Sequence, residues 1–313
     1  MPTFCARVRT CCFPKISQCR LFREAGGCCG PLHHGCPVNP CVPERGEAHL
    51  VRPRYNQDMP MRLMTFNIRF ANPEDGPNRW EFRKELVLET IWAWSPDLIA
   101  AQEVTVPQLE YLATHLTGYA PFIQHRDIDP TCQYPTIFYQ SETIVPGEGN
   151  EFWLSETPQV HRSKSWDSAF PRMVTYGLFR EVRRDLWFYF ANTHLDHISG
   201  MARIQGAIML RDLFRRLEEP AILAGDFNDQ PSSEVHRTLT GPGSRLRDSW
   251  EVLQQPENGV STHHGFDGKY FGGRIDWILL TEPFFLKTAR IITYNQANRY
   301  PSDHFPYCVD LDY

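Results

Sequence analysis

Residues 221–228 read AILAGDFN, an apolar run that ends in an acidic residue and an amide. The run has the length and composition of a buried strand that leads into a loop. On an extended chain, Asp226 and Asn228 would project to the same face, because side chains alternate along a strand. A carboxylate beside a carboxamide can hold and deprotonate a water while the amide donates to a developing oxyanion. The sequence therefore predicts a reactive site at the end of this strand.

Polar side chains also lie at the ends of other apolar strands, before and after this segment. They are Asn67 after MTF, Glu103 in LIAAQE, His194 in YFANTH, Asp276 in RIDWILL, and Asp303 and His304 before FPYCVDL. Each alone has an ordinary explanation, since a strand-end Asp or Asn usually caps a turn and a lone His is usually structural. Strand ends in layered α/β proteins are also where sites are built. We therefore interpret the joint pattern as one site, with Asn192 on the strand face of His194.

The rest of the chain alternates between helical and strand patterns. Helical spacing covers 79–94 and 200–217, and Pro107 opens a further helix through about residue 115. Strands are expected at 62–69, 97–104, 136–140, 173–179, 186–194, 221–228, 274–280 and 305–313. Strands that alternate with helices early and then predominate favour an α/β fold with mixed sheets.

Charge is distributed unevenly along the chain. The 313 residues carry a formal net charge of -5, but residues 61–313 hold 33 Asp and Glu against 24 Lys and Arg. A domain with this negative net charge is not expected to bind many phosphates of a duplex. The excess of carboxylates is consistent with a site in which several of them surround a cation. No run of 18 or more apolar residues is present, so a membrane-spanning helix is not expected.

Residues 1–60 differ in composition from the predicted domain at 61–313, and they hold eight of the 10 cysteines. They show neither a lasting hydrophobic period nor a signal-peptide h-region, so we expect a leader that is disordered or not part of the mature protein. A zinc cluster would draw on Cys28, Cys29, His33, His34, Cys36 and Cys41, whose spacing does not match paired C-x₂₋₄-C ligands. The two remaining cysteines, Cys132 and Cys308, make no disulfide framework, which predicts a cytoplasmic protein.

Taken in order, the motifs TFNIR, AQEV, NTHLDH, GDFND, RIDW and PSDHFP resemble the endonuclease/exonuclease/phosphatase superfamily, which includes deoxyribonuclease I. The resemblance covers residues 61–313, and EDGPNRW, FWLSETP and FPRMVTYG look like a bacterial branch whose substrate is unassigned. It implies a four-layer α/β sandwich, in which two mixed β-sheets pack face to face and are flanked by helices. It also implies a single active site at the sheet edges.

The resemblance assigns expected roles to the strand-end residues. Glu103, Asp303 and Asn67 match residues that hold Mg²⁺ and its waters, with Mn²⁺ as a substitute. Asp226 matches the aspartate that orients or deprotonates the attacking water, and Asn228 matches its phosphate-contacting partner. These five residues would therefore form the metal and water side of the site.

The remaining site residues are expected to contact the substrate. By resemblance, His304 binds the scissile phosphate, and Asp276 orients His304. His194 stabilises the phosphorane or the leaving group. Arg69 stands where the apurinic-endonuclease branch has an acidic residue, so a second metal there is not expected. We expect Arg69 and Arg172 to bind substrate, with a local salt bridge and a strand-flanking charge as the respective alternatives.

The function implied is a Mg²⁺-dependent hydrolase of phosphoester bonds, a phosphodiesterase or phosphatase. A hard cation held by carboxylate and carboxamide oxygens neutralises an anionic ester and assists its leaving oxygen. One alternative is a nuclease of the same superfamily, either a 3′–5′ exoribonuclease or an endonuclease, and another is a catalytically inactive binding scaffold. The expected partner is a phosphoester substrate, with nucleic acid among the candidates, and neither a membrane nor an obligate protein partner is inferred.

Overall fold

The computed structural model describes residues 59–313 except 124–127 and 271, and its strands form two six-stranded sheets. The first sheet has the order β11-β12-β1-β2-β4-β3, with β1 (Met61–Asn67), β2 (Leu98–Val104), β3 (Tyr119–Phe122), β4 (Tyr134–Gln140), β11 (Phe285–Ile291) and β12 (Tyr307–Asp312). The second has the order β5-β6-β7-β8-β10-β9, with β5 (Ile144–Trp153), β6 (Met173–Glu181), β7 (Leu186–His194), β8 (Ala221–Asp226), β9 (Arg247–Asp248) and β10 (Asp276–Leu280). The leader predicted over residues 1–60 lies almost wholly outside the described residues.

Both sheets are mixed and they pack face to face. In each, one parallel pair at the centre, β1 with β2 and β7 with β8, is flanked by antiparallel neighbours. Buried side chains of both sheets share one cluster, in which Leu63 and Ile137 of the first meet Phe188 and Ile222 of the second. The continuous apolar runs of β2 and β8 follow from this arrangement, because central strands here are covered on both faces.

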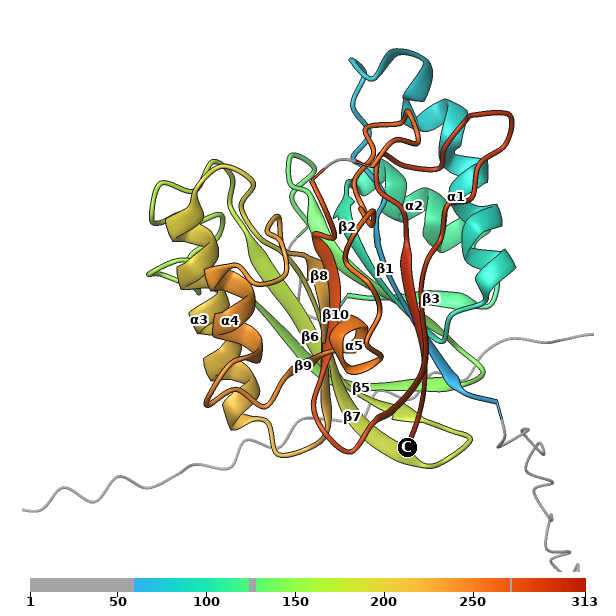
Figure 1. Ribbon diagram of the computed structural model, residues 1–313. Helices are drawn as coiled ribbons and strands as arrows, with labels where there is room; N and C mark the ends of the chain where they lie inside the picture. Colours follow the sequence, from blue (N-terminus) through green and yellow to red (C-terminus); the bar gives the residue numbers. More distant parts are fainter. Residues whose placement is uncertain (1–58, 124–127, 271) are drawn as a thin grey trace, which may run out of the picture. The chain divides into compact units, whose positions relative to one another are not determined.

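Helices cover the two outer faces, which completes the four layers (Figure 1). α1 (Trp80–Trp94) and α2 (Val106–His115) pack on the first sheet, and α3 (Gly200–Arg216) and α4 (Glu234–Thr240) pack on the second. The helix α5 (Ser249–Val252) and the 3₁₀ turn η1 (Gly76–Asn78) are shorter. The predicted four-layer α/β sandwich is therefore confirmed. Among the described residues, no helix is both long and apolar enough to cross a membrane.

Local sequence signals set the ends of the first two helices. Ser95 closes α1 in the left-handed conformation, with its N–H donating to the carbonyl of Ile91, directly before Pro96. α2 begins with a capping box between Thr105 and Gln108 and has a proline in its first turn. Both boundaries lie within one residue of the positions predicted from the sequence.

The strand registers bring several polar ends to one edge of the sandwich. Asp226, the last residue of β8, pairs with His194 at the end of β7 and with Asp276 at the start of β10. In the facing sheet, β1 ends at Asn67, which pairs with Gln102 of β2. The fold thus positions the predicted strand-end residues together.

Candidate active site

Asp226 lies at the centre of the site and is almost completely buried. Its Oδ2 accepts a hydrogen bond from Asn67 Nδ2 at 2.9 Å, and it lies 3.3 Å from His194 Nε2. Its Oδ1 accepts from the backbone N–H of Asn228 at 2.9 Å. Burial and the neighbouring Asp276 carboxylate raise the pKa of Asp226 to about 7. A carboxylate with this pKa is suited to accepting a proton near neutral pH.

Gly225 explains how this carboxylate reaches its neighbours. A Cβ atom at Gly225 would lie 2.2 Å from the carbonyl oxygen of Thr193 on β7, far inside van der Waals contact. Only glycine therefore allows β7 and β8 to approach this closely just before Asp226. The glycine of GDFND thus permits the close approach of β8 to Thr193, directly before the paired residues Asp226 and His194.

The prediction that Asp226 and Asn228 share one strand face is wrong. β8 ends at Asp226, and Asn228 lies beyond it with a φ of 50°, a left-handed conformation that asparagine tolerates better than most residues. This turn brings the backbone N–H of Asn228 onto Asp226 and its Nδ2 to 3.0 Å from His194 Nε2. The two side chains still meet at the site, through a turn instead of an extended strand.

His304 and Asp276 form a buried pair beside Asp226. His304 Nδ1 lies 2.9 Å from Asp276 Oδ2, and His304 Nε2 lies 3.8 Å from Asp226 Oδ2. Burial acts to lower the pKa of His304, but the carboxylates of Asp276, Asp226 and Asp303 outweigh it and raise the pKa to about 10. His304 is therefore an imidazolium at neutral pH, aimed at the centre of the site.

His194 has the opposite electrostatic environment. Burial, together with the positive charges of Arg172 and His304, holds the pKa of His194 well below its ordinary value. The imidazole is therefore neutral at neutral pH and can donate or accept hydrogen bonds. Two histidines in different protonation states consequently face one carboxylate.

The three residues predicted to hold a metal ion lie next to this centre. Glu103 Oε1 accepts from Asn67 Nδ2 at 3.2 Å, so this amide joins Glu103 to Asp226. Glu103 has a φ of 63° and lies in a bulge of β2, an irregularity that redirects a strand side chain. Asp303 is buried, and the positive charges of His304 and Arg69 hold its pKa below the ordinary value although burial acts to raise it.

The donor set fits a hard divalent cation. Glu103, Asp303 and Asn67 offer carboxylate and carboxamide oxygens, which are the ligands that Mg²⁺ takes. Near them, Asp276 Oδ1 is buried without a hydrogen-bond partner among the described residues. Two nearby groups of residues bring their ligand atoms within 4.8 Å of one another: His263–Asp303–His304 and Asp226–Asp276–His304. Glu103 belongs to neither group.

The two predicted substrate-binding arginines lie in different surroundings. Arg69 donates to both oxygens of Asp75, at 3.0 and 2.9 Å, so the salt-bridge alternative describes its observed contacts. Arg172 reaches the site interior, where Nη2 lies 3.2 Å from His197 Nδ1 and Nε lies 3.7 Å from Asp196 Oδ2. Burial lowers the pKa of Arg172 against the opposing charges of Glu103, Asp196 and Asp226.

His263 belongs to the site but was not predicted. Its ring centroid lies 4.9 Å from that of His304, and its backbone forms an isolated β-bridge with the same residue. The only sequence signal was its place in the segment STHHGFDG, upstream of RIDW. A loop histidine of this kind has no periodic pattern that would place it at a strand edge.

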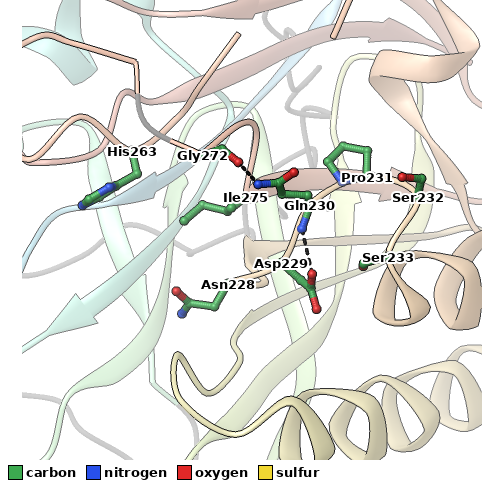
Figure 2. A pocket seen from close by; sticks show the side chains of 9 residues that line it. All are labelled: Asn228, Asp229, Gln230, Pro231, Ser232, Ser233, His263, Gly272 and Ile275. Carbon is green, nitrogen blue, oxygen red and sulfur yellow. Dashed lines mark hydrogen bonds between the residues drawn. The ribbon is translucent and has the colours of Figure 1, made fainter. Parts of the chain in front are cut away.

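An open cleft of about 550 Å³ adjoins the candidate site (Figure 2). It is lined by Asn228, Asp229, Gln230, Pro231, Ser232, Ser233, His263, Gly272 and Ile275. One wall is the loop that follows β8, and the other belongs to the segment before β10. Because Asn228 and His263 are shared, this cleft continues directly from the site.

Comparisons with known proteins agree with this geometry. The model of the endonuclease/exonuclease/phosphatase family matches residues 64–304. A mannosyl-6-phosphatase of Bacteroides thetaiotaomicron is 30% identical, with a TM-score of 0.74, over 81% of this chain and 100% of that one. Rat nocturnin is 25% identical over 84% of this chain and 69% of its own length. The human nocturnin catalytic domain, at 21% identity and a TM-score of 0.62 over 81% of this chain and 93% of that one, shares the fold.

Proposed function

Since the chain belongs to the endonuclease/exonuclease/phosphatase family and is a phosphoester hydrolase, we propose that it cleaves a compact phosphoester with a bound divalent cation. The observation that carries this proposal is the convergence on Asp226. One carboxylate contacts the amide that links it to Glu103, the backbone of Asn228 and a neutral histidine. Such an arrangement supports direct attack by water, without a covalent intermediate.

Asp226 is the general base in this proposal. It takes a proton from the water whose oxygen forms the new bond to phosphorus, while the bond from phosphorus to the ester oxygen breaks. That oxygen leaves with the bonding electron pair and takes a proton from solvent to become the alcohol. Asn67 and the backbone of Asn228 hold the carboxylate in place. The raised pKa of Asp226 makes the proton transfer favourable near neutral pH.

The charged groups around Asp226 bind the phosphate. The His304 imidazolium, oriented by Asp276, pairs with a phosphate oxygen, and the guanidinium of Arg172, which lies 3.7 Å from Asp196 through its Nε, supplies a second cation. Neutral His194 and the side chain of Asn228 donate hydrogen bonds to the oxygens that gain charge in the transition state. Arg69 acts through its ion pair with Asp75, which holds the loop after β1.

Asn67, Glu103 and Asp303 would hold the cation, Mg²⁺ or Mn²⁺ in its place. When bound, it neutralises the ester and assists departure of the leaving oxygen.

A compact substrate is favoured over a long nucleic acid. The relative named for mannosyl-6-phosphatase activity supports a phosphomonoester, and the acidic balance of residues 61–313 does not suit a duplex. The test is phosphate release from hexose 6-phosphates with Mg²⁺ or Mn²⁺, beside single-stranded RNA and plasmid DNA. We expect turnover of the small esters, and rapid cleavage of RNA or plasmid with none of the small esters would select the nuclease alternative.

A further inference from the structure

The cleft beside the catalytic centre has two ends of different character. Asn228 and His263 lie on one side of it, and Ser232 and Ser233 lie on the other (Figure 2). The side-chain amide of Gln230 donates to the carbonyl of Gly272, which ties the two walls together. Its volume of about 550 Å³ is within the range of about 300–1,000 Å³ that small-molecule sites occupy. The cleft therefore has room for an organic group attached to a phosphate at the catalytic end.

His263 is the residue that connects this cleft with the phosphate position. Its ring packs edge-on to His304, with an angle of 64° between the ring planes. Neither ring nitrogen makes a hydrogen bond within the described residues, although the ring is only partly exposed. The proposed mechanism gives His263 no role, so its nitrogens are available to a group in the cleft.

The charge of the lining restricts what this group can be. Among the described residues, no Lys or Arg lines the cleft, and the one lining carboxylate, Asp229, is paired with Arg203 at 3.2 Å. Arg237 contacts the lining through the backbone carbonyl of Ser232. An anionic group here would have no free cation to pair with, and burying it unpaired is costly. Amide and hydroxyl groups, by contrast, can donate to and accept from hydroxyl groups.

We infer that this cleft binds the alcohol part of the phosphoester, that this part is an uncharged polyhydroxylated group, and that His263 hydrogen-bonds the hydroxyl nearest to the phosphate. The inference rests on the proposed function, since it takes the phosphate to lie between His304 and Arg172. It adds a substrate class, phosphomonoesters of sugars and other polyols, and a specificity-determining residue. Gln230, Ser232 and Ser233 supply the remaining hydroxyl contacts.

Matched substrates test the chemistry of the cleft in the full chain. The better of glucose 6-phosphate and mannose 6-phosphate is compared with its 1,6-bisphosphate, which adds one anion, and with phenyl phosphate, which has no hydroxyl group. We expect kcat/KM to fall roughly 10-fold or more for each comparison, as expected when polar groups are left unpaired or an anion lacks a partner. Equal rates on phenyl phosphate, or a preference for the bisphosphate, would overturn the inference and leave the hydrolase intact.

His263→Phe isolates the hydrogen bond, because phenylalanine keeps a ring against His304 and lacks the nitrogens. We expect KM for the hexose phosphate to rise roughly 3- to 10-fold, which corresponds to one neutral hydrogen bond, with a much smaller change for phenyl phosphate. His263→Gln, which keeps an N–H donor, should recover part of the loss. His115→Phe, at the exposed end of α2, is the matched control and should leave both constants unchanged.

Two further outcomes separate this inference from the proposed function. Equal KM changes on both esters in His263→Phe would mean that the residue acts through His304 alone, and would reject the hydroxyl contact. Calorimetry measures binding of the hexose phosphate without turnover when the protein carries Asp226→Asn. The comparison is between Asp226→Asn alone and Asp226→Asn combined with His263→Phe. A protein that releases phosphate from none of these esters would refute the proposed function itself, and this inference with it.

Discussion

At the scale of single residues, the carboxylate of Asp226, the base in the proposed mechanism, has a cost in stability. The folded protein binds its proton more tightly than the unfolded chain does, because burial and Asp276 raise its pKa from 3.8 to about 7. The free energy of unfolding therefore falls as pH rises through this interval. The carboxylate proposed as the base therefore also lowers the stability of the metal-free protein at neutral pH.

Replacing Asp226 with asparagine should move activity and stability in opposite directions. We expect kcat to fall about 10²-fold or more, because no general base remains. In chelator at pH 8, the melting temperature should rise by about 5 °C, since the buried charge is gone, and the gain should vanish below pH 4. Asp276→Asn loses the charge that orients His304 and raises the pKa of Asp226, but it leaves the base in place and should lower kcat less. A melting temperature that falls in Asp226→Asn at pH 8 would contradict the assigned electrostatics.

Glu103→Gln should weaken metal binding more than it alters folding. Removing one charged oxygen from the donor set is expected to raise the metal concentration for half-maximal activity by roughly 10-fold or more. Titration of Mn²⁺ by calorimetry gives the same quantity without turnover. Glu110→Gln, exposed on α2, is the control and should change neither value. Full activity of the unmodified protein in excess chelator would refute the cation altogether.

The residue scale also shows where sequence reasoning ends. Asp226, His194 and Asp276 could be placed together because each ends or begins an apolar strand, and strand ends meet at a sheet edge. The left-handed turn at Asn228 and the position of His263 could not, since they depend on loop conformation and long-range packing. Arg69 was predicted with two alternatives, and its bidentate contact with Asp75 depends on a turn that the sequence leaves open.

At the scale of elements, buried strands were predicted from the sequence more accurately than strands at the sheet edges. Strands in the middle of each sheet, such as β2 and β8, are continuous apolar runs and were predicted close to their observed bounds. The edge strands carry weaker patterns, because one side of an edge strand has no neighbour. β5 contains Pro146, Gly147 and Gly149, and β11 alternates between exposed and half-buried residues. These edges, with short α4 and α5, were missed or left within long loops.

Helix α1 contributes to the site through one buried side chain. Arg83 donates hydrogen bonds to the backbone carbonyls of Ile68, Arg69 and Phe70, and to that of Pro301. The loop after Asn67 and the loop before Asp303 are therefore both held by a single guanidinium. No periodic pattern predicted this residue, since an arginine on a helix is ordinarily exposed.

Arg83→Met should destabilise the protein and loosen the site together. We expect a loss of about 3 kcal/mol or more in the free energy of unfolding, because buried carbonyls are left without donors. KM for metal and substrate should rise in the folded fraction, as Asn67 and Asp303 lose their fixed positions. Urea unfolding measures the first effect, and Lys84→Met, the next residue on the same helix, is the control. Equal unfolding midpoints for the two variants would contradict the anchoring role.

At the scale of the whole molecule, the two sheets are joined beneath the site by polar side chains within an apolar core. Gln102 Nε2 donates to Asn192 Oδ1 at 2.7 Å, and Asn192 Nδ2 donates to the carbonyls of Ala101 and Thr136. Asn192 belongs to the second sheet, and its partners belong to the first. Because both amide nitrogens donate to fixed partners, the pair ties one sheet to the other, while Gln102 Oε1 is buried without a hydrogen-bond partner among the described residues. Asn192 was predicted only to share a strand face with His194.

The distribution of positive charge argues for shallow salt dependence of the reaction. In the sequence, six basic residues are candidates for the mouth of the site: Arg69, Arg126, Arg162, Lys164, Arg172 and Arg299. Arg69 and Arg162 are paired with Asp75 and Asp129, and Lys164 and Arg299 contact backbone carbonyls, while Arg126 lies outside the described residues. Arg172 lies at the site, where its buried Nε is 3.7 Å from Asp196 Oδ2 and makes no hydrogen bond within the described residues.

A protein that neutralises many phosphates loses affinity steeply with salt, with a slope of about -0.9 per contact on duplex DNA. We therefore expect the logarithm of kcat/KM on a hexose phosphate to fall with a slope that corresponds to one or two contacts, those of His304 and Arg172. Plasmid DNA should be nicked weakly or not at all under the same conditions. The measurement compares both substrates between low and near-physiological salt at constant free Mg²⁺. A steep slope with efficient nicking would show that a local basic surface overcomes the acidic domain, and would favour the nuclease over the compact ester.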